Sequence, residues 1–137
     1  MTGVHVRMRI GDELYALPVA NVLEIADLGE ISPVPGTASA VLGVRNLRGR
    51  VLPVFDLALL FGVSGQGGAP SKLVVAEHHG RQAGLAIDEV TDVAELADAT
   101  TETGSEFLSG STLEDGKLVG VIDAGQVFSA LEGHATQ

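Results

Sequence analysis

The sequence predicts a mainly β fold, built from two similar small units that are each closed by a short helix. Glycine is frequent, with 18 of 137 residues, and it separates short apolar runs, as in short strands joined by turns. The first run, Val4–Ile10, alternates apolar and polar residues with a period of two, which indicates a half-buried strand. The second half of the chain then repeats the pattern of the first at an offset of about 67 residues.

The apolar runs of the first half predict four strands. Val4–Ile10 leads through a Gly11-Asp12 turn into a second strand over Glu13–Leu17, so the two runs should form a hairpin. Two further strands are expected at Val41–Leu47 and Val51–Phe55.

A short helix is expected directly after the first hairpin. Pro18 suits the first position of a helix. In that helix Val19, Val22 and Leu23 would share one face, and Glu24 would lie outside it. Glu24 is then an exposed acid, unless this helix packs beside a neighbouring hairpin and lets Glu24 pair with Arg48.

A second helix is expected where the first half ends. Asp56 stands directly before Leu57–Phe61, and its simplest role is that of a helix N-cap. The segment Gly62–Pro70 is rich in glycine and predicts a flexible linker.

The repeat separates residues that the fold needs from residues that only one half carries. Val51–Asp56 aligns with Leu118–Asp123. We therefore expect one domain, residues 1–137, made of two pseudo-repeated subdomains, about 4–68 and 71–132, which pack on a shared apolar interface. Residues present in both halves suit bulges, turns and caps, and these are Gly43 with Gly110, Gly49 with Gly116, and Asp56 with Asp123.

One hairpin differs strongly in charge between the two halves. The segment Arg45–Arg50 holds three of the eight basic residues, whereas its counterpart Thr112–Lys117 contains Glu114 and Asp115. The basic tip is either a solvated edge that keeps the protein in solution or a docking point whose arginines reach carboxylates or carbonyls of a partner. The residues alone leave both interpretations open.

The composition excludes several classes of function. A net charge of −10 should repel nucleic acids and anionic lipid surfaces. There is no cysteine, which excludes disulfides and thiolate metal sites. No stretch is long and apolar enough for direct membrane insertion, and no secretory signal is visible, so we expect a cytoplasmic protein.

No catalytic or metal-binding constellation is visible. His78 and His79 are adjacent on a predicted strand, so their side chains should point to opposite faces and could not easily share one ion. The paired acids Asp88-Glu89 and Glu114-Asp115 are expected to be surface charges. We therefore expect a protein that is not an enzyme and that has no cofactor and no metal.

Four stretches together carry a resemblance to the CheW-like family of chemotaxis coupling proteins. The most specific is the Asn-Leu-Arg-Gly element, Asn46–Gly49, within its run of strands. The resemblance extends from about Val4 to Leu131. The stretches are Gly11–Val19 with Val22–Ile25, Val34-Pro35 with Val41–Leu57, Gly84–Val93, and Gly116–Asp123.

The resemblance implies a fold of two intertwined, five-stranded, SH3-like β-barrels with a few short helices. It also implies a non-catalytic scaffold that bridges the cytoplasmic tip of methyl-accepting-type chemoreceptors and the regulatory domain of a CheA-like histidine kinase. The receptor would lie along a groove between the barrels. Carried onto this sequence, the residues of that groove are Val22, Glu24, Arg48, Val51, Leu73 and Val93.

Three alternatives remain beside this interpretation. The chain could be a kinase's own regulatory module, or an adaptor of a related pilus-motility pathway or of another two-component pathway. It could also be a small-molecule sensor that uses the apolar groove between the barrels.

Overall fold

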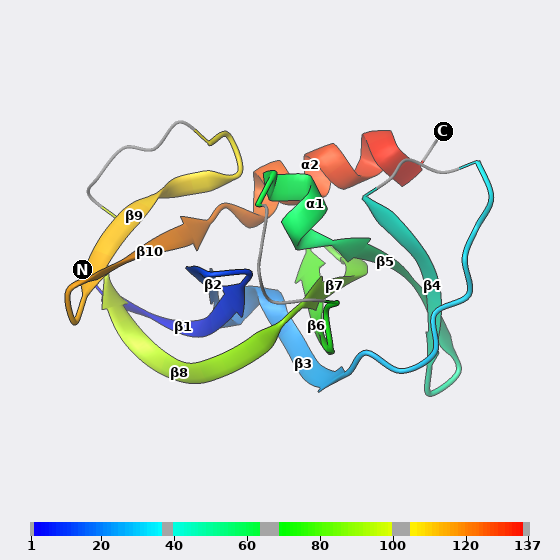
Figure 1. Cartoon of the computed structure of the whole chain (residues 1–137), viewed down its shortest axis with the longest axis horizontal. Helices are drawn as coiled ribbons and strands as arrows, with labels where there is room; N and C mark the ends of the chain where they lie inside the picture. The colour runs from blue at the N-terminus through cyan, green and yellow to red at the C-terminus, as the bar shows by residue number, and fades with distance from the viewer. Residues whose placement is uncertain (1, 37–39, 64–68, 100–104, 136–137) are drawn as a thin grey trace.

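Two five-stranded β-sheets form the body of the molecule (Figure 1). The computed structural model describes residues 2–36, 40–63, 69–99 and 105–135. Sheet A has the strand order β8-β1-β2-β10-β9, with bounds β1 Thr2–Ile10, β2 Glu13–Pro18, β8 Glu89–Ala97, β9 Leu108–Glu114 and β10 Lys117–Ile122. Sheet B has the order β3-β6-β7-β5-β4, with bounds β3 Val22–Asp27, β4 Val41–Leu47, β5 Arg50–Asp56, β6 Lys72–His78 and β7 Arg81–Ile87.

The two sheets are intertwined because each takes strands from both halves of the chain. Exchanging every strand for its counterpart in the other half, β1 for β6, β2 for β7 and so on, converts the order of sheet A into that of sheet B. The parallel pair β2–β10 in sheet A thereby corresponds to the parallel pair β5–β7 in sheet B. The expectation of a mainly β fold with two five-stranded, intertwined units is confirmed.

One predicted element is wrong. The helix expected from Pro18 is only a three-residue 3-10 turn, η1 (Val19–Asn21), and Glu24 lies on strand β3 instead. The apolar spacing fits a helix, but β3 pairs antiparallel with β6, and Val22 and Ile25 are β-branched residues that favour strands. The tertiary partner therefore overrides the local pattern.

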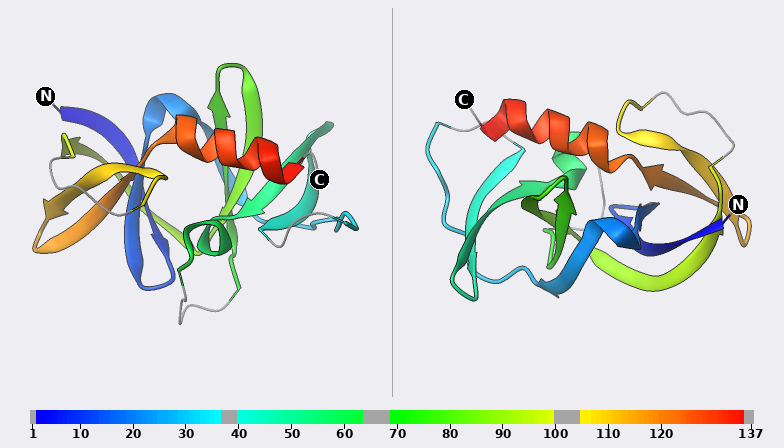
Figure 2. Two further views of the ribbon diagram at one scale, coloured as in Figure 1. Left: turned by 90° about the horizontal axis from the view of Figure 1, so that it is seen from above. Right: turned by 180° about the vertical axis from the view of Figure 1, so that it is seen from behind.

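The main core lies between the two sheets. Its buried side chains include Met8 and Leu17 of sheet A and Phe55 and Leu85 of sheet B. Helix α1 (Leu57–Phe61) and helix α2 (Ala124–Ala135) cover this core (Figures 1 and 2). The apolar faces that the two sheets turn toward each other are buried in this shared core, and each sheet also encloses a smaller apolar cluster of its own.

Two glycines shape the edge strands in the way the sequence predicts. Gly43 has a φ of 144° and sits at a bulge in the β4–β5 ladder. The backbone of Ser32 crosses directly over it, so an added Cβ would lie 2.2 Å from the Ser32 carbonyl oxygen. Gly110, with a φ of 154°, sits at the corresponding bulge between β9 and β10.

The helices begin at the predicted caps. The carboxylate of Asp56 accepts hydrogen bonds from the backbone N–H groups of Ala58 and Leu59, and α1 ends at Gly62 in the left-handed conformation. Asp123 accepts a hydrogen bond from the N–H of Gln126 at the start of α2. Of the linker predicted over Gly62–Pro70, residues 64–68 lie outside the described residues. Among the residues that the structure describes, no helix has the length and apolar character needed to cross a membrane.

Candidate functional site

The β4–β5 hairpin holds Arg48 in an uncommon backbone conformation. Arg48 has a φ of 51° and Gly49 a φ of 85°, so both central residues of this two-residue turn are left-handed, as in the turns that match the twist of a hairpin. Asn46 stabilises the turn because its Oδ1 accepts the Gly49 N–H at 3.0 Å. This arrangement gives a physical reason for the Asn-Leu-Arg-Gly spacing: the asparagine and the glycine form the turn, and the turn presents the arginine.

Arg48 binds Glu24 across the barrel that sheet B forms. Glu24 lies on β3, and Arg48 lies at the tip of the hairpin formed by β4 and β5. Strands β3 and β4 are the two edges of sheet B. Arg48 Nη1 donates to both carboxylate oxygens of Glu24 at 2.7 Å. The ion pair that the sequence offered as an alternative for Glu24 therefore exists, although a strand and not a helix carries the glutamate.

A second arginine, which the sequence did not single out, joins this pair. Arg50 Nη2 lies 3.3 Å from Glu24 Oε1, and its Nη1 donates to Gln82 Oε1 at 2.5 Å. Gln82 donates in turn to the Glu77 carboxylate at 3.3 Å. The basic residues of Arg45–Arg50 were the only sign in the sequence that Arg50 takes part in this site. The pairing of strands in sheet B brings Arg50 to Glu24 and Gln82.

The Glu24–Arg48 pair stays accessible to a partner. The Arg48 side chain is 69% exposed, whereas that of Glu24 is 22% exposed. Exposed apolar residues lie on neighbouring strand positions, with Leu23 and Ile25 on β3 and Val51 on β5. Leu23 and Ile25 alternate with Glu24, so they lie on the opposite face of β3. Exposed apolar area together with a charged pair is a common composition of protein interfaces, because the apolar area favours burial while the charges fix the register.

The predicted groove residues are distributed over both sheets. Val22, Glu24, Arg48 and Val51 belong to sheet B, whereas Val93 lies on β8 of sheet A and is 56% exposed. Strands β3 and β8 both run along the lower side of the molecule in Figure 1. Val22 is half-buried and packs against the main core.

Leu73 does not belong to this surface, and its prediction as a groove residue is wrong. Its side chain is 0% exposed and packs in the interior of sheet B against Leu52 and Val75. A Cβ on Gly84 would lie 2.7 Å from Leu73 Cδ1, which shows how tightly the site is filled. The side chain points to the inner face of β6, so a partner cannot reach it.

Arg45, the third basic residue of the tip, supports the fold. Its Nε donates to the Leu28 carbonyl at 2.9 Å, and its guanidinium packs where a side chain on Gly29 would otherwise lie. It therefore holds the segment after β3 against β4. Of the three arginines in Arg45–Arg50, only Arg48 and Arg50 contact Glu24.

An ion pair fixes β8 in sheet A. Arg7 on β1 and Asp92 on β8 are cross-strand neighbours, and the guanidinium binds both carboxylate oxygens. The hydrogen bond from Arg7 holds the pKa of Asp92 below its ordinary value. This pair anchors the strand that carries Val93.

Two expectations about titratable residues are wrong. His79 lies in the β6–β7 turn with a φ of 52°, so its ring meets that of His78 with centroids 4.2 Å apart instead of pointing to the opposite face. The side chain of Asp88 is only 9% exposed and accepts the Gly11 N–H at 2.8 Å, so it is a fold-stabilising group and not a surface charge. Over the described part of the chain, no three His, Cys, Asp or Glu side chains gather in a way that could hold a metal ion.

The family follows from comparison with known proteins. The family model described as a CheW-like domain matches residues 5–132. The chain belongs to the CheW-like family. This CheW-like chain is 30% identical to a probable chemotaxis protein CheW of Rhizobium etli, over 95% of this chain and 90% of that protein. It is 38% identical to the chemotaxis protein CheW of Helicobacter pylori, over 73% of this chain and 61% of that protein.

A solved structure has the same fold. The crystal structure of the scaffolding protein TtCheW from Thermoanaerobacter tengcongensis superimposes with a TM-score of 0.81 at 28% sequence identity. The match covers 90% of this CheW-like chain and 85% of that one. The fold class expected from the sequence is thus shared with an experimental structure of the family.

Proposed function

We propose that this CheW-like protein is a non-catalytic adaptor that couples chemoreceptors to a chemotaxis-type histidine kinase. Membership of the CheW-like family and similarity to chemotaxis proteins and to a scaffolding protein support this proposal. The receptor is the cytoplasmic tip of a methyl-accepting-type chemoreceptor, and the kinase is CheA-like and binds through its regulatory domain. This function places the protein in the cytoplasm, at the receptor array.

The observation that carries the proposal is the Glu24–Arg48 pair, whose arginine is exposed, together with exposed valines on both sheets. The pair would fix the register of a receptor helix, and Val51 and Val93 would supply apolar contact. The pair links the two edges of sheet B before a partner binds. A rigid body can pass a displacement of the receptor on to the kinase.

The test is reconstitution of receptor-containing vesicles, kinase and this protein, with kinase activity and sedimentation with the vesicles as readouts. Arg48→Glu should abolish the coupling of the kinase to the receptor and leave folding intact. Asp115 is the matched control, because it occupies the same left-handed turn position in the equivalent hairpin of sheet A, with a φ of 49°. Asp115→Arg should keep coupling. Normal coupling by Arg48→Glu, or equal loss by both variants, would contradict the proposal.

The second candidate function is that of an adaptor in a related pilus-motility pathway. The chain is 47% identical over 49 residues to the protein FrzA of Myxococcus xanthus and 35% identical over 86 residues to the protein PilI of Pseudomonas aeruginosa. The adaptor function is the same in this candidate, but the output differs. Deleting the gene and scoring swimming against surface motility separates the two.

A further inference from the structure

Glu24 has two cationic neighbours, and they reach its carboxylate in different ways. Arg48 donates to both carboxylate oxygens through a single nitrogen, Nη1, at 2.7 Å. Arg50 Nη2 approaches only Oε1, at 3.3 Å. The Glu24 side chain is 22% exposed, whereas that of Arg48 is 69% exposed and that of Arg50 is 42% exposed. A carboxylate that is largely withdrawn from solvent therefore has two arginines, and the closer of them is also the more exposed.

The contact with Glu24 leaves most of the Arg48 guanidinium unused. A guanidinium has N–H donors on all of its nitrogens, but only Nη1 faces Glu24. Within the described parts of the chain, Nε and Nη2 of Arg48 donate to no other residue. These two nitrogens form the edge of the guanidinium that can bind a carboxylate with two parallel hydrogen bonds. Arg48 can therefore hold Glu24 and still offer this edge to a carboxylate of a partner.

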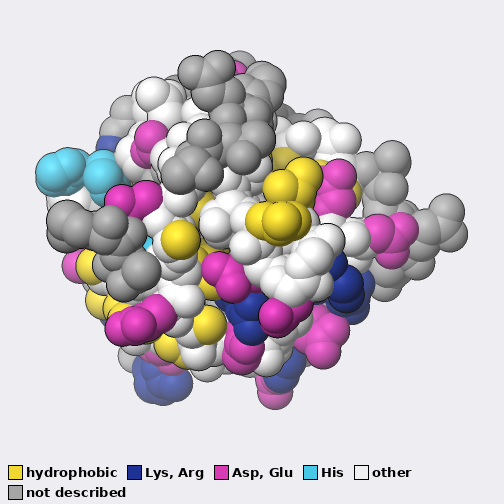
Figure 3. Space-filling model, turned by 90° about the vertical axis from the view of Figure 1, so that its left-hand side faces the viewer, with side chains coloured by type: hydrophobic (Ala, Val, Ile, Leu, Met, Phe, Trp, Pro, Cys, Tyr) yellow, Lys and Arg dark blue, Asp and Glu magenta, His cyan; other side chains and the backbone are white. Residues whose placement is uncertain are grey.

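The corresponding pair in sheet A has no such free edge. Asp92 occupies the repeat position of Glu24, and both Nε and Nη2 of Arg7 bind its carboxylate. The exposures are also reversed, since the Arg7 side chain is 23% exposed and that of Asp92 is 43% exposed. On the side of the molecule that sheet A forms, Figure 3 shows basic side chains lying among acidic ones. The edge of the arginine that binds carboxylates is therefore occupied in sheet A and open in sheet B.

Arg50 is held in place independently of Arg48. Its Nη1 donates to Gln82 Oε1 at 2.5 Å, and Gln82 donates in turn to the Glu77 carboxylate at 3.3 Å. Gln82 and Glu77 are cross-strand neighbours on β7 and β6, so the strand pairing of sheet B fixes the amide that binds Arg50. A movement of Arg48 toward a partner would therefore leave the second cation beside Glu24.

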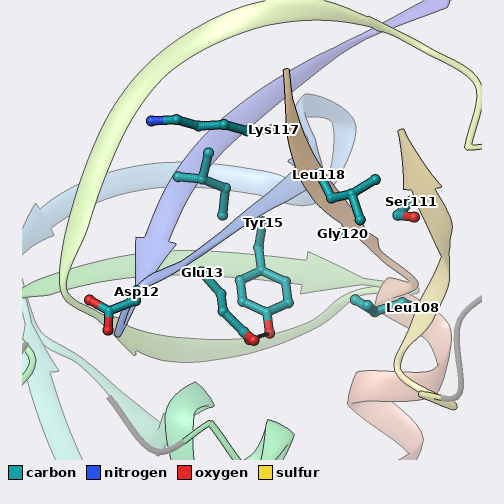
Figure 4. Close-up of a pocket in the computed structure, with 9 residues that line it drawn as sticks. Asp12, Glu13, Tyr15, Leu108, Ser111, Lys117, Leu118 and Gly120 are labelled. Atoms are coloured by element: carbon teal, nitrogen blue, oxygen red, sulfur yellow. Dashed lines mark hydrogen bonds between the residues drawn. The ribbon is translucent and has the colours of Figure 1, made fainter. Parts of the chain in front are cut away.

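Sheet A does not hold a second cation in this way. Lys117 corresponds to Arg50, because each is the first residue after its hairpin turn and pairs with the last residue before it. The strand registers place Leu14 where sheet B has Gln82, so Lys117 lacks the amide that fixes Arg50. Figure 4 shows the Lys117 side chain extending away from Glu13. Lys117 is therefore a matched position at which loss of the charge should not affect the site on sheet B.

We propose that Arg48 binds a carboxylate of the chemoreceptor tip through Nε and Nη2, and that Arg50 is the positioning residue that makes this binding possible. With the partner in place, Glu24 and the partner's carboxylate bring two negative charges to the site, and Arg48 and Arg50 bring two positive ones. Without Arg50, two carboxylates would share one arginine, and their repulsion would weaken binding. The inference rests on the proposed function, because it names the group that the receptor supplies to the Glu24–Arg48 surface.

The first test measures how tightly the full chain binds receptor-containing vesicles, by sedimentation over a range of receptor concentrations. Arg50→Ala should weaken binding several-fold, while its melting temperature stays close to that of the wild type, because the pair is exposed. Arg50→Lys keeps the charge beside Glu24 and should restore most of the binding. Lys117→Ala is the matched control and should bind like the wild type. Normal binding by Arg50→Ala, no recovery in Arg50→Lys, or an equal loss in Lys117→Ala would overturn the role of Arg50.

The second test identifies the carboxylate on the receptor. Each Asp and Glu of the receptor tip is changed singly to Asn or Gln, and binding is measured with the wild type and with Arg48→Lys. The lysine keeps the charge but cannot donate two parallel hydrogen bonds, so it should weaken binding several-fold. Loss of the carboxylate that Arg48 binds should also weaken wild-type binding, and Arg48→Lys should then add little more.

The outcomes separate this inference from the proposed function. If Arg48→Glu abolishes coupling but every receptor variant is additive with Arg48→Lys, the receptor supplies no carboxylate to Arg48, and this inference alone is wrong. If Arg48→Glu keeps normal coupling, the surface does not bind the receptor, and the proposed function is wrong as well.

Discussion

Arg48 Nη1 lies 2.7 Å from both carboxylate oxygens of Glu24, although the two residues are 24 positions apart and belong to opposite edges of sheet B. The contact therefore forms only because sheet B curves until its two edge strands, β3 and β4, come close to each other. Arg48 is exposed and in a left-handed conformation, which is costly for a residue with a side chain. The ion pair leads to the first prediction below, and the left-handed backbone of Arg48 leads to the second.

Exchanging the two charges should separate stability from coupling. In the variant Glu24→Arg with Arg48→Glu, the ion pair can form again with reversed polarity, but the new arginine at position 24 then faces Arg50. The melting temperature should therefore recover in part relative to Arg48→Glu alone. Coupling should stay lost, because the surface then shows the partner an inverted charge pattern. Thermal melting and the reconstituted kinase assay measure both. Recovered coupling in the exchanged variant would show that the pair acts only within the fold.

Replacing Arg48 by glycine should cost little stability. Glycine adopts the left-handed turn without strain, and this gain offsets the loss of a surface ion pair worth up to about 1 kcal/mol. Arg48→Ala loses the same ion pair but keeps the strain, so it should be less stable than Arg48→Gly by roughly 1 kcal/mol. Urea unfolding compares the two, and neither should couple receptor to kinase. An alanine variant as stable as the glycine variant would argue against strain at this position.

Leu73 and Val51 should respond in opposite ways to truncation. Leu73→Ala opens a cavity in a closely packed interior and should lower the free energy of unfolding by about 2–5 kcal/mol. Val51→Ala removes an exposed side chain and should change stability by less than about 0.5 kcal/mol, while it weakens receptor coupling. Denaturant unfolding and vesicle sedimentation provide the two readouts. If the Leu73→Ala protein were as stable as the wild type but did not couple receptor to kinase, Leu73 would have to contact the partner directly.

Gly43 and Gly49 both have positive φ angles but should differ in their tolerance of alanine. At Gly49 nothing lies within 4 Å of an added Cβ. Gly49→Ala should therefore lower the free energy of unfolding only by the roughly 1–2 kcal/mol that a left-handed backbone costs a residue with a side chain. At Gly43 the Ser32 carbonyl adds a backbone clash, which should cost roughly a further 1–3 kcal/mol. Calorimetry on the pair measures the difference. Equal melting temperatures would contradict the close crossing of Ser32 over β4.

The Arg7–Asp92 pair should make stability depend on pH in the acid range. Because the pKa of Asp92 is lowered in the folded state, its contribution is complete above the unfolded value of about 3.9 and is lost as the pH falls through the lower folded value. The difference in unfolding free energy between the wild type and Asp92→Asn should therefore be constant near neutral pH and shrink below about pH 4. A difference that grows on acidification would have the wrong sign.

The strands, turns and caps follow from the sequence because their causes are local. Alternation over Val4–Ile10 reflects one buried face, and Asp56 needs only the next three residues to act as a cap. The repeated glycines could be assigned before the structure because bulges and left-handed turns tolerate few other residues. The helix expected after Pro18 is wrong because pairing with β6 decides the conformation of β3. Each paired residue of β3 has its partner in β6 at least 45 positions further along the chain, so no local pattern reveals the partner.

The sequence by itself determined the family, the order of most elements and the presence of one basic hairpin, since these depend on neighbouring residues and on motif spacing. Only the tertiary structure decided that Glu24 binds Arg48 and Arg50 and that Leu73 is buried. These two features depend on which strands become neighbours and on which side of a strand faces the core. Contacts between residues far apart in the chain set both, and no local pattern encodes them.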